Sequence, residues 1–284
     1  MIKFDLFTYQ ISPDTTDQTK LIFKTERTLE ELIAEKNKLF YSVFLDKINF
    51  YNRGHKLNFK IEYIDPTFIL IRLANKRSVK IEKQFQKEYY ESEPSCLIAF
   101  HNDPKVQLIA IESDKSSFSS SFTVLKVIEK TIDRALNEYS LNFYPQPKYE
   151  PSVFWDIINK NEGRIERIKF EFTKPNLGRV NEAISEDLKA ASKILNSAST
   201  KVEFEAPKNQ TLENVNQENP VIKDFVKASS EGAGPAKVKL KGVRIWETTE
   251  NAVKTFEFDD LEIEANDKII NSFVNALKSK MKGG

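Results

Sequence analysis

The chain of 284 residues alternates between stretches with a strand period and stretches with a helical period. The clearest succession lies in its second half. Ile168, Phe170 and Phe172 alternate with polar residues, which predicts a strand with one buried face. A turn at Lys174–Asn176 ends this strand. Apolar residues then recur at helical spacing over Val180–Leu195, which predicts a helix that packs back onto a sheet.

The first half of the chain predicts a strand, a helix and an antiparallel meander. Ile2–Ile11 alternates as a strand does, and Thr28 and Glu31 have the spacing of a capping box that opens a helix reaching Ile48. From residue 55 to 113, short apolar runs are divided by Pro, Asn and Asp, which predicts antiparallel strands joined by turns. The expected strands are Leu57–Ile64, Phe68–Ala74, Val79–Tyr90, Cys96–Phe100 and Val106–Glu112.

A serine-rich stretch, Ser116–Ser121, opens a further predicted helix, and serines in that position cap free amides that also favour anions. Three prolines between residues 145 and 151 then suggest a domain boundary. We expect an N-terminal β-rich domain with a central helix over residues 1–147 and a C-terminal βαβαββα domain over 148–284. The fold class predicted is α+β, with largely antiparallel sheets, packed helices and two subdomains.

The last part of the second domain carries two further alternating runs and a helical one. Ala236–Trp246 and Ala252–Glu264 are expected to pair as a hairpin, and Asp267–Met281 is expected to be a helix.

Composition excludes several classes of chemistry. The net charge is +1, so attraction to nucleic acid has to come from a local patch. One cysteine and two histidines leave too few ligands for a Cys/His zinc module, and the eight glycines form none of the common phosphate-binding loops. We therefore expect no cofactor and no metal. The N-terminal residues alternate instead of forming a signal peptide, and no stretch is apolar enough to insert in a membrane, so we expect a cytoplasmic protein.

The strongest candidate for a function is a basic stretch from Arg53 to Lys87, in which nine basic residues against three acidic residues give +6. Aromatic residues interleave with the charges, as in proteins that follow a nucleic-acid backbone while stacking bases. The alternative is a solvated sheet face whose lysines discourage edge pairing. The candidate nucleic-acid-binding residues are Lys76, Arg77, Lys80, Lys83, Phe85, Lys87 and Tyr89.

Within this set, four residues are expected on one face of the strand predicted from Val79. Lys83 and Lys87 would contact phosphates, and Phe85 and Tyr89 would stack on bases.

Three other constellations compete with this one. Asp103, Glu112, Asp114 and Lys115 resemble the acids and lysine of a metal-dependent nuclease, although their spacing departs from the usual order. Eight acidic residues against Lys254 over Glu247–Asp267 could hold a hard cation or meet a basic partner. They could also face the basic stretch, either within the fold or across a homodimer. Cys96 is in a predicted apolar strand, where a thiol normally packs and stays protonated, and His101 at the strand end could be its partner only if the chain folded back.

Four segments together resemble those of a family of uncharacterised bacterial proteins found among phage-defence genes. They are M-I-K-F-D-L-F at the start, the serines at 116–121, R-I-K-F-E-F-T-K-P-N from residue 167, and A-G-P-A-K-V-K-L-K-G from residue 233. The resemblance covers most of the chain in order and pattern. It implies a role in antiviral defence as an accessory or sensor subunit, and it transfers no functional residue.

The sequence thus favours a nucleic-acid-binding subunit of an antiviral defence system, more a binding protein than an enzyme. A partner protein would supply any chemistry. A metal-dependent nuclease and a protein-interaction subunit are the alternatives.

Overall fold

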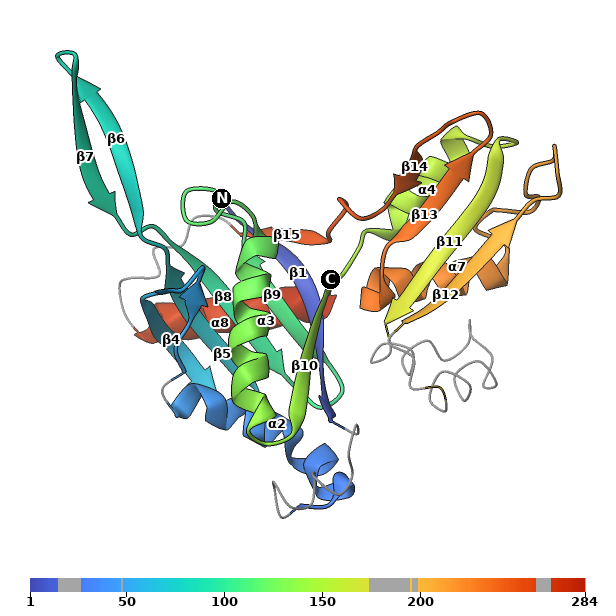
Figure 1. Cartoon of the computed structure of the whole chain (residues 1–284). Coiled ribbons are helices and arrows are strands. Elements are labelled where there is room, and N and C mark those ends of the chain that lie inside the picture. Colours follow the sequence, from blue (N-terminus) through green and yellow to red (C-terminus); the bar gives the residue numbers. More distant parts are fainter. Residues whose placement is uncertain (15–26, 47, 174–194, 196–198, 259–266, 284) are drawn as a thin grey trace. The chain divides into compact units, whose positions relative to one another are not determined.

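The computed structural model describes residues 1–14, 27–46, 48–173, 195, 199–258 and 267–283, and the chain forms two compact units (Figure 1). The first unit comprises Met1–Pro145 and Thr255–Gly284, and the second comprises Gln146–Lys254. The second unit is therefore inserted into the first. This division differs from the expected domains 1–147 and 148–284, because residues 255–284 belong with the N-terminal part of the chain.

A seven-stranded sheet forms the centre of the first unit. Its strands follow the order β10-β1-β9-β8-β5-β4, and β15 also pairs with β1. The neighbours whose registers are defined run antiparallel, so the predicted α+β class with antiparallel sheets is confirmed. The strands are β1 (Ile2–Pro13), β4 (Phe59–Asp65), β5 (Phe68–Ala74), β8 (Ser95–Asn102), β9 (Gln107–Glu112), β10 (Leu141–Pro147) and β15 (Thr255–Phe258).

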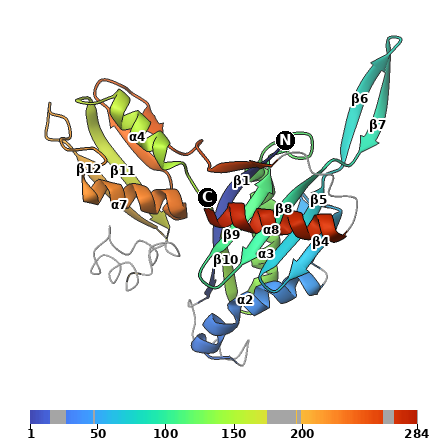
Figure 2. The same cartoon turned by 180° about the vertical axis from the view of Figure 1, so that it is seen from behind.

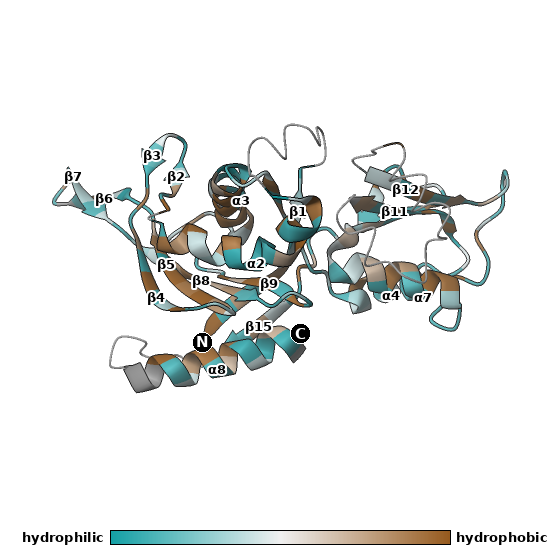
Figure 3. Cartoon of the chain, turned by 90° about the horizontal axis from the view of Figure 1, so that it is seen from below, coloured by the Kyte–Doolittle hydropathy of each residue, from teal (hydrophilic) through white to brown (hydrophobic). Residues whose placement is uncertain are grey.

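Helices cover both faces of this sheet, as Figure 3 shows. Helices α2 (Leu29–Leu45) and α3 (Ser121–Asn137) lie over one face, and α8 (Asp267–Gly283) lies over the other. The alternation in β1 distributes its side chains accordingly. Tyr9 stacks on Phe40 of α2 with ring centroids 5.1 Å apart, whereas Phe4 belongs to the buried cluster that contains Leu277 of α8. The core therefore occupies two layers.

The predicted start of α2 agrees with the observed cap. The backbone N–H of Thr28 donates to the Glu31 carboxylate over 2.7 Å, and the Glu31 N–H donates to the Thr28 hydroxyl over 3.2 Å. This reciprocal pair confirms the capping box. Helix α3 starts at Ser121 with Ser120 as its cap, at the end of the serine-rich stretch that was expected to open it.

The predicted strand Val79–Tyr90 is wrong. The chain instead forms a hairpin of β6 (Arg77–Lys83) and β7 (Gln86–Ser92), which we call the arm and which extends away from the sheet (Figures 1 and 2). Gln84 and Phe85 form its turn with φ angles of 51° and 66°. These positive values fit a type I′ turn, which usually contains Asn or Gly. Neither residue is present here, so the alternating pattern hides the turn.

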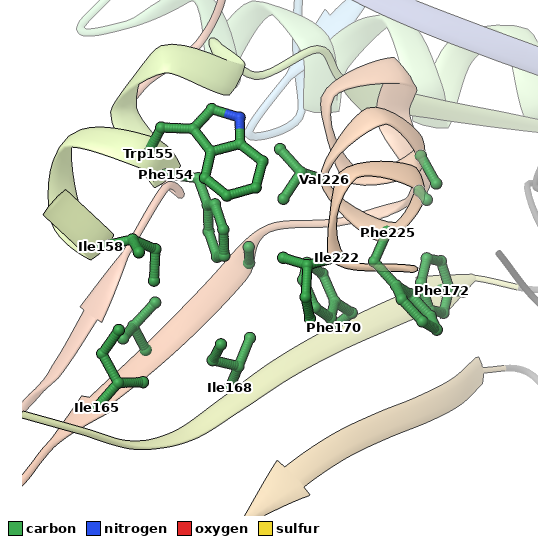
Figure 4. Close-up of a cluster of buried hydrophobic side chains, with 14 of the residues drawn as sticks. Phe154, Trp155, Ile158, Ile165, Ile168, Phe170, Phe172, Ile222, Phe225 and Val226 are labelled. Carbon is green, nitrogen blue, oxygen red and sulfur yellow. The ribbon is translucent and has the colours of Figure 1, made fainter. Parts of the chain in front are cut away.

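The second unit places two helices on a smaller antiparallel sheet. Helices α4 (Pro151–Lys160) and α7 (Pro220–Ala228) contribute to its core, and α7 continues into a π-helical turn, η1 (Ser229–Ala233). At the centre of this core, the rings of Phe170 and Phe225 stack with their centroids 5.0 Å apart (Figure 4). The strands are β11 (Ile165–Thr173), β12 (Ser199–Glu205), β13 (Ala236–Leu240) and β14 (Trp246–Thr248), in the order β12-β11-β13-β14. The helix predicted over Val180–Leu195 lies outside the described residues, except for Leu195.

The predicted hairpin of Ala236–Trp246 with Ala252–Glu264 is also wrong. Strand β13 stops at Leu240 because the chain turns at Gly242, whose φ is 75°, and it pairs with β11 and the short β14. Strand β15 pairs with β1 instead. Phe256 of β15 stacks on Phe4 with centroids 5.5 Å apart. Burial of this aromatic pair favours the long-range pairing over a local hairpin.

We predict that Leu277→Ala destabilises the first unit by about 2–5 kcal/mol, because Leu277 is fully buried between α8 and the sheet. Both tryptophans of the chain, Trp155 and Trp246, lie in the second unit. Denaturation followed by circular dichroism should therefore show the loss of stability of the first unit, while the denaturant midpoint of the tryptophan fluorescence transition stays unchanged. Phe225→Ala is the matched variant and should move the fluorescence transition. A fluorescence shift in Leu277→Ala would contradict this division of the chain.

Candidate nucleic-acid interface

A short hairpin between α2 and the sheet carries Arg53. Strands β2 (Tyr51–Asn52) and β3 (His55–Lys56) pair with Asn52 opposite His55, which leaves Arg53 and Gly54 as a two-residue turn. Their φ angles are 49° and 85°. Two successive positive values define a type I′ turn. The turn therefore holds Arg53 at its tip, beside the basic residues of β3.

This hairpin borders a pocket of about 530 Å³, which we call the basic pocket. The pocket also contacts the first turn of α3 and the segment that joins β5 to the arm. Four of its lining side chains, those of Arg53, Lys56, Lys76 and Arg77, carry a full positive charge, and none of the described lining residues is acidic. Its lining residues are Asn52, Arg53, His55, Lys56, Leu57, Asn75, Lys76, Arg77, Phe118, Ser119 and Thr123.

Hydrogen bonds fasten the start of the arm to the segment before α3. The Asn75 side-chain amide donates to the Ser117 carbonyl over 2.8 Å, and Arg77 Nη1 donates to the Lys115 carbonyl over 3.3 Å. The Asn75 backbone N–H donates to the Pro94 carbonyl over 3.0 Å at the other end of the arm. Asn75 is thus bound to carbonyl groups on two sides and Arg77 to one, so the base of the arm is fastened at the pocket that Lys76 and Arg77 line.

An acidic residue next to the pocket offsets part of its charge. Lys76 Nζ lies 3.3 Å from the Glu93 carboxylate, and both side chains are largely exposed. A hydrogen bond from Asn58, followed by one from Lys76, lowers the pKa of Glu93, so this carboxylate stays ionised at neutral pH. Such exposed pairs hold their partners weakly. Lys76 can therefore exchange Glu93 for another anion.

The serines before α3 are engaged in caps. The Ser120 hydroxyl accepts the Thr123 N–H over 3.3 Å, and the Ser119 and Thr123 hydroxyls lie 2.9 Å apart. Ser117 donates to the Asp114 carbonyl over 3.0 Å. The first turn of α3 therefore contributes the positive end of the helix dipole to the pocket, while most of its hydroxyls have local partners.

The two strands of the arm determine which side chains share a face. Opposite residues in an antiparallel pair project to the same side. Lys80 lies opposite Tyr89, and Lys87, on the same face as Tyr89, lies opposite Glu82. The other face carries apolar side chains that are about half exposed, namely Val79, Ile81 and Tyr90.

The structure thus brings together only part of the predicted nucleic-acid-binding set. Lys76 and Arg77 line the basic pocket, whereas Lys80, Lys87 and Tyr89 share a face of the arm. Phe85 is at the tip and 97% exposed. Lys83 lies opposite Gln86, whereas Lys87 lies opposite Glu82. The register therefore does not place Lys83 with Lys87 and Tyr89, contrary to the prediction that they share a face. The side chain of Lys83 lies outside the described part of the structure.

The predicted nuclease residues are not assembled into a site. Asp103 precedes β9 and Glu112 ends it, so the two lie roughly 20 Å apart for a strand of this length. The Glu112 carboxylate accepts the Leu97 N–H over 2.8 Å, and burial raises its pKa. Asp114 accepts the Ser116 N–H over 2.8 Å. In the described residues no group of three His, Cys, Asp or Glu side chains could hold a metal ion.

Cys96 and His101 lie at opposite ends of β8, paired with Leu73 and Phe68 respectively. Burial raises the pKa of the Cys96 thiol to about 12. Burial also lowers the pKa of His101, whose Nδ1 lies 2.8 Å from the Val106 carbonyl oxygen. These two side chains have structural roles and do not form a nucleophile and its base.

The acidic stretch Glu247–Asp267 is divided between the two units. Glu247 and Glu250 belong to the second unit and Glu257 to the first, whereas residues 259–266 and the side chain of Asp267 are outside the described part. Gly234, between η1 and β13, has a packing role. A Cβ on Gly234 would lie 2.2 Å from the Glu171 carbonyl oxygen, so glycine is required for close approach to β11.

Arg53 and Lys56 were not among the predicted site residues. They belong to the basic stretch, but the strand pattern starts after them and gives no sign that they face Lys76 and Arg77. The dipeptide Arg53-Gly54 was the available signal, because glycine after a short polar run is typical of a tight turn.

We predict that Cys96 does not react with thiol reagents in the native protein at pH 8. Its side chain is fully buried and its raised pKa leaves almost no thiolate. Labelling with a chromogenic disulfide should become complete only when denaturant unfolds the first unit. Complete labelling of the native protein within minutes would contradict the packing described for β8.

In the described residues, no helix is both long enough and apolar enough to cross a membrane. Comparison with known proteins adds no relative: no family model, no curated protein and no solved structure matches the chain. The resemblance to phage-defence proteins therefore stays a prediction. A function has to be inferred from the geometry of the basic pocket and the arm.

Proposed function

We propose that this chain is a non-enzymatic binding protein for single-stranded nucleic acid, with phosphates held in the basic pocket and bases stacked along the arm. The observation that carries the proposal is the convergence of four positive side chains on a pocket whose described lining residues include no acid. Such a concentration of charge attracts the phosphate backbone without regard to sequence. In a chain of net charge +1, this attraction is local.

The arm supplies the second part of a single-strand site. It starts at Arg77 on the pocket rim and carries Phe85 at its tip, with Tyr89 68% exposed in between. Exposed aromatic rings cost free energy in water and are typical of platforms on which bases stack. The seven residues of β6 span about 23 Å, so one strand can follow the arm from the pocket.

Charge on the arm itself is nearly balanced, with four basic against three acidic residues over 77–92. Lys87 also lies opposite Glu82. We therefore assign the main phosphate contacts to Arg53, Lys56, Lys76 and Arg77, and we assign stacking to Phe85 and Tyr89. Single strands fit this division better than duplexes, because their bases are free to stack on protein rings.

A role in antiviral defence, with a partner protein that supplies any chemistry, belongs to the same proposal and is supported by the sequence resemblance alone. A protein-interaction subunit is the second candidate. The apolar face of the arm favours it, since Val79 and Ile81 are 45% and 48% exposed.

Reversing the pocket charge should weaken binding to every sequence. In Arg53→Glu/Lys56→Glu, the slope of log affinity against log salt for single-stranded DNA or RNA should flatten by up to about 1.4, or about 0.7 for each lost phosphate contact. Fluorescence anisotropy in EDTA across a salt series measures this. Lys223→Glu/Lys227→Glu makes the same charge change on the exposed face of α7 and is the control. An unchanged slope in the pocket variant would reject the pocket as the phosphate site.

Removing the ring at the tip of the arm should weaken binding without changing the salt slope. Stacking of one base on one aromatic ring contributes about 1–3 kcal/mol, so Phe85→Ala should lower single-strand affinity roughly fivefold to 150-fold. Tyr90→Ala, on the face opposite Tyr89, is the control and should have little effect. Equal affinities of wild type and Phe85→Ala would exclude the tip from the interface.

A further inference from the structure

The arm has two unpaired edges. In the described structure β6 and β7 pair only with each other, and residues 84–92 are all exposed. A two-stranded hairpin is marginally stable in water by itself, and an open strand edge is a template for another strand. Which strand the arm accepts is determined by its free backbone groups and its charges.

The turn identifies the free backbone groups. A two-residue turn makes its flanking residues, here Lys83 and Gln86, a hydrogen-bonded pair. Hydrogen-bonded pairs then recur at every second position, so Glu88 and Tyr90 direct their N–H and C=O groups toward β6. Lys87, Tyr89 and Glu91 direct theirs away from it. A strand added to β7 can pair only with these three residues.

Charge then selects one partner register. When β7 meets a second β7 in antiparallel orientation with Tyr89 opposite Tyr89, Lys87 lies opposite Glu91 twice, and all three free residues are paired. Centring on Lys87 or on Glu91 would place like charges opposite each other, which is destabilising. The registers centred on Glu88 or Tyr90 remove both Lys87–Glu91 pairs and leave one of the three free residues opposite a position outside β7. In the second of these registers that position is Glu93, which is already bound by Lys76 and Asn58.

The other edge is less suited to self-pairing. The free residues of β6 are Ser78, Lys80 and Glu82, and its centred register places Lys80 opposite Lys80. A shifted register pairs Lys80 with Glu82 but leaves Ser78 opposite the turn. The β7 edge alone combines opposite charges, a tyrosine pair and full use of the free backbone groups.

We propose that two copies of this chain associate through β7, related by a two-fold axis at Tyr89, with Lys87 of each copy opposite Glu91 of the other. The two arms then form a four-stranded antiparallel sheet. Its face that carries Lys80, Lys87 and Tyr89 is continuous across the axis. This association goes beyond the proposed nucleic-acid binding and does not depend on it.

A charge-exchange experiment without nucleic acid tests the register. In Glu91→Lys, the introduced lysine meets Lys87 of the second copy. In Glu82→Lys/Lys87→Glu, the introduced glutamate meets Glu91 of the second copy, while an opposite-charge pair is kept within each arm. Each variant alone should dimerise about tenfold more weakly than wild type at low salt, because two attractive pairs become repulsive. An equimolar mixture should recover dimers, since every cross-arm pair then joins a lysine to a glutamate.

Sedimentation velocity at high micromolar concentration, at low and high salt, distinguishes the outcomes. Wild-type dimers that weaken with salt, together with recovery in the mixture, support the proposal. A wild-type protein that stays monomeric at low salt, or a mixture no more dimeric than its components, would overturn it.

Cross-linking gives a second readout. Opposite Cα atoms in a hydrogen-bonded antiparallel pair are about 5.5 Å apart, within the range of a disulfide. Tyr89→Cys should therefore oxidise to a covalent dimer, whereas Lys80→Cys at the centre of β6 should not. The native Cys96 is buried and does not compete. Cross-linking of Lys80→Cys in place of Tyr89→Cys would assign the interface to β6 and reject the proposed register.

Discussion

Burial of one sheet on both faces is the constraint on which the rest of the first unit depends. Strands β5 and β8 have almost no exposed side chain between Phe68 and Ile71 or between Cys96 and Phe100. Helices α2 and α3 cover one face of the sheet, and α8, from the end of the chain, covers the other. The central strands of this sheet are therefore filled by apolar side chains from Phe68 to Ile71 and from Cys96 to Phe100. Charge gathers where the chain leaves the sheet, in the β2–β3 hairpin and at the base of the arm.

The sequence predicted most elements whose burial follows a regular period. The strand that starts at Ile2, the capped helix at Thr28 and the last helix from Asp267 all appear, because each repeats its apolar residues at one spacing. The pairing of β15 with β1 could not be foreseen, because it depends on Phe256 and Phe258 meeting Phe4 across more than two hundred residues of sequence. A local period contains no information on such a contact.

The candidate site was only partly predicted, again because a local pattern contains no information on contacts between distant residues. Lys76 and Arg77 were recognised by charge, but their proximity to Arg53 and Lys56 depends on how the chain turns at Arg53, a non-glycine residue with positive φ. The turn at Gln84 and Phe85 also changes which aromatic and basic side chains share a face. Residues that alternate along one strand share a face, whereas the same residues folded into a hairpin are divided between a tip and two faces. Lys83 and Lys87 are separated in this way.

The central claim, that a single strand runs from the basic pocket along the arm, is tested most directly by photo-cross-linking. Short single-stranded oligonucleotides with photoreactive bases would be bound at low salt in EDTA, irradiated, and the attached peptides identified by mass spectrometry. The account predicts cross-links at Phe85 and Tyr89 and in the segment from Asn52 to Leu57. Cross-links confined to the second unit, or no binding at low salt, would contradict it.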